Sequence, residues 1–372
     1  MVYHLYNASM SHLAPTVLGG ILFNAQITFQ DGMDGTFIII WLPDKLLFGT
    51  KETEIEKYIS LFRFYNFVNY AFVEGNFGLI KAIYKIRNEA DKLVIHSNFN
   101  LFGRYPIFLA MLGLRGKSFL RRCIKVEWSV QKELAAKGLV KILTRTLQRR
   151  IYAQLGWIIA LTSEDKMLLE SRFVNSNIRR ASYLGSIDSA INKHQLKINP
   201  GDKLKILLSH SGHVHNNHIR SLDLLSKFKA SNIEITCPLC YGPASHIEKV
   251  ISYGKSIFGD KFGYFTELKP LEQYLTLISK QHVYITSAEI QTGLFAATTA
   301  LANGLKVYLG DNLFKSLLST GYLYFNVNQL EDIDFQSLAQ PLSEDEFSIN
   351  QKIYRERFIN GSVETWKEIY NA

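Results

Sequence analysis

Two stretches of the chain combine small and polar residues in a pattern that suits phosphate binding. In the first, Gly212 follows a short apolar run and precedes a helical pattern. A glycine here lets the backbone approach a ligand closely, and the helix start offers unpaired N–H groups at its positive dipole end. Residues 204–217 therefore predict half of a phosphate site, although an ordinary strand-to-helix turn has the same pattern.

The second stretch, residues 287–293, lies between another apolar run and a helical segment of small residues. We expect a diphosphate to rest on the backbone N–H groups of Thr292 and Gly293. Glu289 and Gln291 are candidates for holding hydroxyl groups of a ribose or a sugar. Glu289 also suits a purely structural role, as an acid that stabilises the dipole of the helix start.

Histidines supply the candidates for proton transfer, because an imidazole titrates near neutral pH. His12 and His96 each fall at the end of a predicted strand, so either is a candidate general base. Four further histidines lie between 210 and 218, but no Asp, Glu or Cys completes a familiar metal-ligand spacing. Cys237 and Cys240 have no second pair, so we predict no metal site.

Alternating strand and helix patterns must position these residues. The first half predicts strands over 2–6, 36–42, 93–95, 123–128 and 157–162, with helices over 13–27, 77–86, 107–112 and 140–155. The second half predicts strands over 205–208, 233–237, 262–265, 282–286 and 305–309, with helices over 218–228, 246–257, 271–279 and 293–302. This alternation predicts parallel sheets covered by helices on both faces, with ligands beyond the C-terminal ends of the strands.

A length of 372 residues and the repeated alternation predict two α/β domains. We place an N-terminal domain at 1–187, a linker at 188–202 and a C-terminal domain at 203–343. Residues 344–372 are expected to form helices that cross back to the first domain.

The amino-acid composition limits the classes of partner that the protein can have. The net charge of +9 favours anionic partners, and a basic, partly apolar stretch at 141–151 suits an anionic lipid surface. Nucleic acid is a weaker candidate, because no basic-aromatic platform motif occurs. Three cysteines predict a reducing compartment. No uninterrupted apolar run reaches the roughly 18 residues of a membrane span, and no basic segment precedes an apolar one as in a secretory signal.

Several motifs resemble those of one bacterial enzyme family. They are ILLSHSGHVHNNHIRSL with CPLCYGP, IQTGLFAATTALANGLKVYL, VIHSNFN and LTSEDKMLLES. The chain is similar, from His4 to Asn326, to the TDP-N-acetylfucosamine:lipid II N-acetylfucosaminyltransferase family, which is the 4-alpha-L-fucosyltransferase group or glycosyltransferase family 56. The resemblance implies a GT-B fold, in which two Rossmann-like doubly wound domains face a central cleft.

The resemblance also implies the chemistry. Such enzymes move a sugar from a nucleotide-diphosphate donor, here linked to TDP or UDP, without a cofactor or a bound metal. The implied acceptor is an undecaprenyl-diphosphate-linked oligosaccharide at the cytoplasmic face of the bacterial inner membrane. The residues implied on the donor side are Ser211, Gly212, Asn217, His218, Tyr241, Gln291 and Gly293. Those implied on the acceptor side are His12, His96 and Asn98.

One motif departs from the family. The family shows a Trp-Gly-x-Asp-like sequence where this chain has Glu127, Trp128, Ser129, Val130 and Gln131. An acid precedes the tryptophan, so Glu127 joins the two histidines as a candidate base, and Trp128 becomes a candidate acceptor contact. The departure leaves the donor sugar and the acceptor open.

Two other functions fit parts of the pattern. A nucleotide-sugar epimerase has the same two-domain shape, but it needs acids and an arginine placed for elimination, and we find no such set. A non-catalytic basic protein that docks on membranes fits the charge alone.

Overall fold

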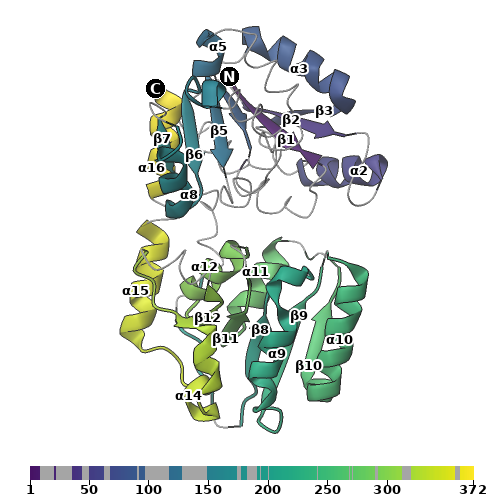
Figure 1. Cartoon of the computed structure of the whole chain (residues 1–372), viewed down its shortest axis with the longest axis vertical. Coiled ribbons are helices and arrows are strands. Elements are labelled where there is room, and N and C mark those ends of the chain that lie inside the picture. Colours follow the sequence, from purple (N-terminus) through teal and green to yellow (C-terminus); the bar gives the residue numbers. More distant parts are fainter. Residues whose placement is uncertain are drawn as a thin grey trace. The chain divides into compact units, whose positions relative to one another are not determined.

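The computed structural model describes residues 1–8, 21, 36–43, 50–62, 68–89, 92–96, 117–127, 149–173, 177–181, 191–192, 194–199, 201–240, 242–267, 269, 271–289, 292–311, 320–356 and 361–372. They form two compact units (Figure 1). The first contains Met1–Gly185 together with Phe358–Ala372, and the second contains Ser186–Arg357.

The described part of the first unit forms a seven-stranded sheet in the order β3-β2-β1-β4-β5-β6-β7, with parallel pairing throughout. Continuous apolar runs such as TFIIIWL form these strands because both faces of the sheet are covered. The strands are β1 (Val2–Asn7), β2 (Thr36–Leu42), β3 (Val68–Glu74), β4 (Lys92–Ile95), β5 (Cys123–Glu127), β6 (Trp157–Ala160) and β7 (Ile178–Arg180).

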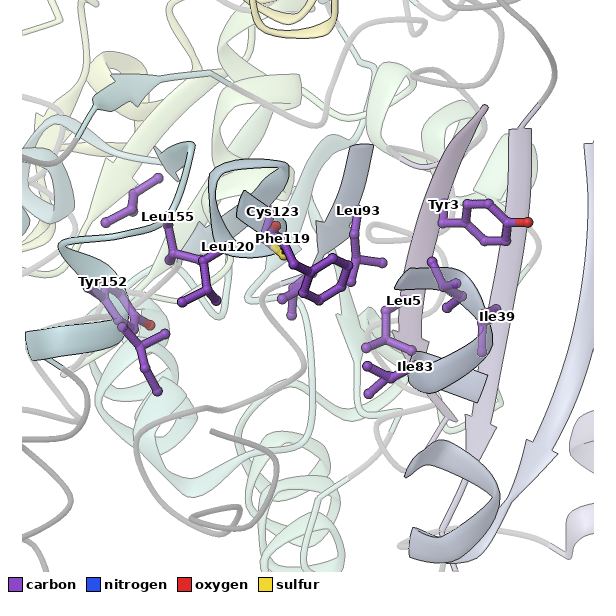
Figure 2. Packing of buried hydrophobic residues seen from close by; sticks show 14 of the residues in the cluster. Tyr3, Leu5, Ile39, Ile83, Leu93, Phe119, Leu120, Cys123, Tyr152 and Leu155 are labelled. Carbon is purple, nitrogen blue, oxygen red and sulfur yellow. Dashed lines mark hydrogen bonds between the residues drawn. The ribbon is translucent and has the colours of Figure 1, made fainter. Parts of the chain in front are cut away.

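Alternate residues of each strand supply two separate cores. On one face, Leu5, Leu93 and Cys123 pack against helices α3 (Gly75–Glu89), α5 (Lys117–Arg121) and α8 (Ser163–Glu170), in the cluster of Figure 2. On the other face, helix α2 (Lys51–Phe62) packs near Ile38 and Ile40, while helix α16 (Gly361–Asn371) buries Trp366, Ile369 and Tyr370 against Val94 and Val126. The alternation with period two therefore assigns each strand side chain to one face.

The described part of the second unit forms a six-stranded parallel sheet in the order β10-β9-β8-β11-β12-β13. Its strands are β8 (Leu204–Leu208), β9 (Ile233–Pro238), β10 (Phe262–Phe265), β11 (Val283–Thr286), β12 (Lys306–Leu309) and β13 (Phe325–Asn326). Its helices are α9 (His218–Ser226), α10 (Ala244–Phe258), α11 (Leu271–Ser279), α12 (Leu294–Ala302), α14 (Phe335–Ala339) and α15 (Glu344–Tyr354), with 3-10 turns η3 (Val214–Asn216), η4 (Gly259–Lys261) and η5 (Val327–Glu331).

The segments predicted as a linker and as returning helices divide between the units. Asn192 Nδ2 donates to the carbonyl of Ser279 (2.8 Å), and Gln195 Nε2 donates to that of Gly304 (3.0 Å), so these residues pack on the second unit. Helix α15 contacts α12 of the second unit, whereas α16 contacts β7 of the first. Of the two predicted C-terminal helices, only α16 therefore joins the first unit. No helix in the described ranges is both long and apolar enough to span a bilayer.

Candidate functional site

The second sheet changes direction between β8 and β11. Strands β9 and β10 extend it on one side of β8, and β12 and β13 extend it on the other side of β11. Ligands of doubly wound proteins bind beyond the C-terminal ends of the two strands at such a switch point. The loops at this position are residues 209–217 and 287–293, the two stretches in which the sequence predicts phosphate binding.

Gly293 brings these two loops into contact. Its backbone is left-handed (φ 71°), and a Cβ added to it would lie 2.4 Å from Nδ1 of His210. Nε2 of the same imidazole lies 3.1 Å from the hydroxyl of Thr292. Burial lowers the pKa of His210 to about 3, so the ring is neutral at physiological pH. Glycine is therefore required at position 293 by both its backbone angle and the neighbouring ring.

Asn217 and Glu289 form a second link between the loops. Asn217 Nδ2 donates to Glu289 Oε1 at 3.2 Å, and the Glu289 N–H donates to the carbonyl of His215 at 2.8 Å. Asn217 has a left-handed backbone (φ 51°), a conformation that asparagine tolerates better than most residues. Two residues predicted on the donor side from different loops are thus neighbours.

The loop after β9 approaches Gly212. The Gly212 N–H donates to the carbonyl of Cys240 at 3.1 Å, and a Cβ added to Gly242 would lie 2.1 Å from the Gly212 oxygen. A Cβ added to Gly212 itself would lie 2.8 Å from Ile247. The glycine predicted from close approach to a ligand is therefore also required by packing within the protein.

Ser211 and His218 point inward and support the loop. The buried Ser211 hydroxyl accepts a hydrogen bond from Asn216 Nδ2 at 2.8 Å. His218 Nδ1 lies 3.3 Å from Nε2 of His246, and burial, followed by the charge of His246, lowers the pKa of His218 to about 4. We expect both side chains to hold the loop in shape, leaving its backbone to contact a ligand.

Three helices at this edge of the sheet begin without a side-chain cap. They are α9, α10 and α12, which start after Asn217, Pro243 and Gly293. In contrast, Asp334 caps α14 and Ser343 caps α15 with side-chain oxygens. An uncapped N-terminus keeps its N–H groups available and favours negative charge. The edge is suited to an anion such as a diphosphate.

The loop histidines do not gather into a metal-binding group. The rings of His213 and His215 stack with centroids 5.0 Å apart. Within the described residues, no cluster of three or more His, Cys, Asp or Glu side chains is arranged to hold a metal ion. Cys237 is buried, and Cys240 Sγ donates to the carbonyl of Glu267 at 3.0 Å.

In the first unit, the sheet changes direction between β1 and β4. His96 directly follows β4, as predicted, but its imidazole is fully buried and stacks on His4, with Nε2 3.0 Å from Nδ1 of His4. Burial, followed by the charges of His4 and Lys125, lowers the pKa of His96. The ring is therefore neutral and has no exposed surface through which to meet a substrate.

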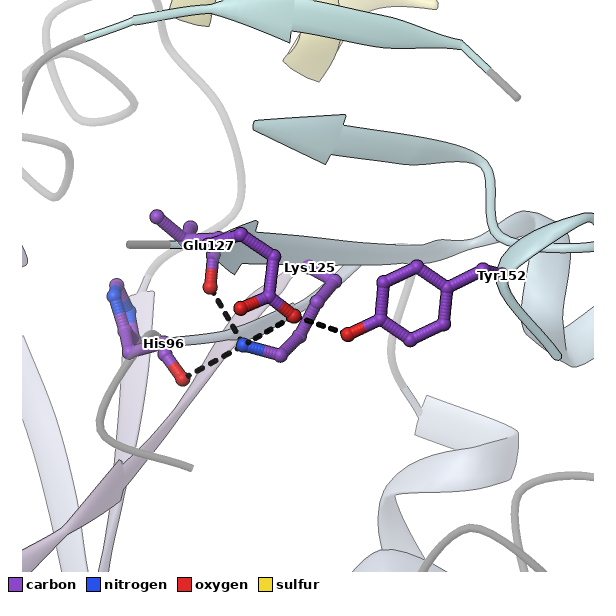
Figure 3. Close-up of polar contacts among 5 residues, drawn as sticks. His96, Lys125, Glu127 and Tyr152 are labelled. Carbon is purple, nitrogen blue, oxygen red and sulfur yellow. Dashed lines mark hydrogen bonds and ion pairs between the residues drawn. The ribbon is translucent and has the colours of Figure 1, made fainter. Parts of the chain in front are cut away.

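Glu127 is the last residue of β5 and belongs to a polar cluster (Figure 3). This cluster lies on the face of the sheet opposite to the His4–His96 pair. Tyr152 donates a hydrogen bond to Glu127 Oε1, and Lys125 Nζ lies 3.4 Å from the same oxygen. Lys125 Nζ also donates to the carbonyls of His96 (3.3 Å) and Val126 (2.6 Å). The buried ammonium group of Lys125 is thus paired with one carboxylate and donates hydrogen bonds to two carbonyl oxygens at the end of the sheet.

The environment of Glu127 suits proton transfer. Glu127 is 4% exposed, and burial raises its pKa, while Lys125 and Tyr152 act in the opposite direction. No described residue donates a hydrogen bond to Oε2. Among the described residues, the carboxylate therefore has one anchored oxygen and one oxygen that receives no hydrogen bond, at the C-terminal edge where ligands bind.

Other predicted site residues lie outside the described residues. They are His12, Asn98, Trp128, Tyr241 and Gln291. Conversely, the sequence did not identify Lys125 and Tyr152 as site residues. The spacing of Lys125 and Glu127 in an apolar strand was an available signal, because residues two apart share a face and buried charges need partners. No local pattern connects Tyr152 to them.

Comparison with known proteins identifies the family. The model of the family described as "4-alpha-L-fucosyltransferase glycosyl transferase group 56" matches residues 55–332 of the 372. This chain belongs to glycosyltransferase family 56. It is therefore a glycosyltransferase, as the motifs of the two loops predicted. A search of curated proteins finds no match.

Solved structures show the fold of this family 56 member. Sucrose-phosphate synthase from Thermosynechococcus elongatus has a TM-score of 0.64 and 10% identity, covering 100% of this chain and 98% of its own. Anabaena HepE, solved with UDP and glucose, has a TM-score of 0.64 and 10% identity, with 99% and 98% covered. A Rickettsia africae glycosyltransferase has a TM-score of 0.64 and 12% identity, with the same coverage. Together with the two parallel sheets, they confirm the predicted GT-B fold.

Proposed function

We propose that this enzyme transfers an amino or deoxy sugar from a nucleotide-diphosphate donor to an undecaprenyl-diphosphate-linked saccharide during assembly of a bacterial surface polysaccharide. The family description names a fucosyltransferase, and fucose is a deoxy sugar. The net charge of +9 suits work beside anionic lipid at the inner face of the inner membrane.

The observation that carries the donor half is the convergence of three uncapped helix N-termini at the C-terminal edge of the second sheet. We assign the donor diphosphate to the N–H groups at Thr292, Gly293 and the first turn of α12. A relative of the same fold, HepE, was solved with UDP and glucose. Because these donors stabilise negative charge without a metal, we expect transfer to persist in EDTA.

In the reaction, an acceptor hydroxyl oxygen attacks the anomeric carbon, the bond from that carbon to the diphosphate oxygen breaks, and the hydroxyl proton leaves to a base. We assign the base to Glu127, through Oε2. Burial raises its pKa, and Lys125 and Tyr152 act in the opposite direction; a raised pKa makes a carboxylate a stronger base. His12 remains the second candidate, whereas His96 is buried against His4.

The test has two steps. The first is thermal-shift screening with UDP-, GDP- and TDP-sugars, where the true donor class raises the melting temperature. The second is transfer of a labelled sugar from that donor to an undecaprenyl-diphosphate-linked acceptor in mixed micelles. Stabilisation by one nucleotide class followed by labelled lipid supports the proposal.

Two results would contradict it. Conversion of the nucleotide sugar into an isomer without any acceptor would indicate an epimerase. Vesicle binding without any response to a nucleotide sugar would indicate a non-catalytic docking protein.

A further inference from the structure

Helix α3 of the first unit exposes a face that combines aromatic and basic side chains. Phe77 is 81% exposed and Tyr84 is 60% exposed, and Lys81 and Lys85 are also exposed. With 3.6 residues per turn, Phe77, Lys81 and Tyr84 share one side of the helix, and Lys85 lies beside them. We call these four residues the α3 face.

The opposite side of α3 anchors the helix. Leu79, Ile83 and Ile86 are at most 4% exposed and pack in the core of the first unit. The helix is therefore anchored by these side chains, while Phe77 and Tyr84 remain largely exposed. Single exposed apolar side chains are ordinary, but two rings two turns apart on one face indicate an interaction surface.

We propose that the α3 face docks the enzyme on an anionic lipid bilayer. This inference rests on the proposed function, because an undecaprenyl-linked acceptor lies in a membrane. A phenylalanine ring gains free energy by entering the acyl boundary, and a tyrosine ring suits the interface, where its hydroxyl stays hydrated. Lysines lay their stems along apolar surface while the ammonium groups reach lipid phosphates.

The distribution of charged side chains on the first unit favours the α3 face as the surface that meets an anionic bilayer. Glu74, the acid that immediately precedes α3, is paired with Lys51 at 3.0 Å. Helix α2, on the other face of the sheet, exposes Glu52 and Glu56, which an anionic surface repels. Protein interfaces are poor in lysine, whereas the α3 face places Lys81 between its two rings. Its composition therefore fits a lipid surface better than a protein partner.

Docking through α3 would serve the reaction. Helix α3 and Glu127 lie on the same face of the first sheet, because Cys123 of the same strand packs with Leu79 and Ile83. Phe77 is in the first turn after the C-terminal end of β3, and Glu127 is at the C-terminal end of β5. The C-terminal ends of parallel strands lie along one edge of the sheet, so Phe77 and Glu127 are at the same edge. A bilayer that contacts Phe77 is therefore on the side of the sheet where we place the acceptor hydroxyl.

The test is co-sedimentation of the full chain with vesicles of phosphatidylcholine and phosphatidylglycerol, compared with phosphatidylcholine alone. We expect binding to the anionic vesicles. Phe77→Ser with Tyr84→Ser should weaken it at least about tenfold, from the lost apolar transfer energy. Lys81→Gln with Lys85→Gln should weaken it about tenfold or more at low salt. Met167→Ser, which removes another side chain that is 62% exposed, should leave it unchanged.

Absence of binding by the wild type, or binding as strong as that of the wild type in both double variants, overturns the proposal. A dimer seen by sedimentation velocity and lost in Phe77→Ser with Tyr84→Ser overturns it in favour of a protein interface. The thermal shift with nucleotide sugars, measured on the same samples, separates this proposal from the proposed function. A retained shift with no vesicle binding contradicts docking alone, and vesicle binding through α3 without any shift contradicts sugar transfer alone.

Discussion

Tyr152 donates a hydrogen bond to the buried carboxylate of Glu127, although 25 residues separate them along the chain. The phenol stabilises the ionised form of the acid, as does Lys125 from the other side. Together they oppose the larger effect of burial, which raises the pKa of this carboxyl group. If Glu127 is the base, the activity of the enzyme also depends on Tyr152, which acts through the pKa of Glu127.

We first predict the effect of Tyr152→Phe. Loss of a donor to the carboxylate raises the pKa of Glu127, so the ionised base persists only at higher pH. The acid limb of the pH–rate profile should therefore move to higher pH. The lost hydrogen bond should also lower the free energy of unfolding by about 1 kcal/mol. The profile of labelled-sugar transfer checks this. Glu127→Gln, which removes the base itself, should lower the rate at every pH. An unmoved acid limb in Tyr152→Phe would assign the base elsewhere.

The second prediction concerns Lys125→Met. Removal of a fully buried cation leaves Glu127 without its charge partner, and breaking a buried pair costs about 3–5 kcal/mol. All four tryptophans, Trp41, Trp128, Trp157 and Trp366, belong to the first unit, so their fluorescence in urea reports its unfolding alone. Lys125→Met with Glu127→Gln should regain part of the loss. Additive losses in the double variant would contradict the pairing.

The third prediction concerns the donor loop. Gly293→Ala places a Cβ against the His210 ring and strains a left-handed residue, so the two loops must move apart. We expect the thermal shift by the donor nucleotide sugar to disappear. Gly201→Ala is the matched control, because Gly201 also has a positive φ (92°) but nothing lies within 4 Å of its added Cβ. It should lose about 1–2 kcal/mol of stability and keep the shift. A normal shift in Gly293→Ala would move the donor site elsewhere.

The fourth prediction is a pH dependence of the second unit. The pKa of His218 is lowered from 6.5 to about 4 in the folded state, so the unfolded chain binds its proton first as pH falls. Stability from this group is complete above pH 6.5 and declines toward pH 4, by at most about 1.4 kcal/mol per pH unit. Hydrogen exchange of β8 and α9 peptides should show this decline. The decline should become shallower in His218→Gln, with the remaining slope due to His210 of the same unit, whose pKa is also lowered, and it should stay unchanged in His194→Gln, which changes an exposed histidine of the same unit.

Strands β8 to β12 of the second unit were predictable because each is a short apolar run bounded by turn residues, whereas the two-residue strand β13 was not predicted. The run predicted over 205–208 is β8 (Leu204–Leu208), and that over 233–237 is β9 (Ile233–Pro238). In the first unit, β3 was missed, because an edge strand is only half buried and its sequence VNYAFVE does not stand out. Helix α2 was also missed, since its sequence KETEIEKYISLF has few apolar positions.

Within the candidate site, the residues of the loops were predictable from local sequence patterns, whereas their distant contacts were not. Local patterns pointed to Gly212 and Gly293, because a turn between a strand and a helix is written in neighbouring residues. The partner of Gly293 is His210, which is 83 positions earlier in the chain and is brought close only by the pairing of β8 with β11. The link from Glu127 to Tyr152 likewise depends on tertiary packing, which a single sequence does not display.

Helix α16 has a consequence for biogenesis. Trp366, Ile369 and Tyr370 close the core around Val94 and Val126, yet the ribosome makes them only after the entire second unit. The nascent first unit must wait with an open hydrophobic face, at risk of aggregation or of capture by chaperones, until residues 361–371 emerge. The half of the enzyme that is synthesised first is then the half that matures last.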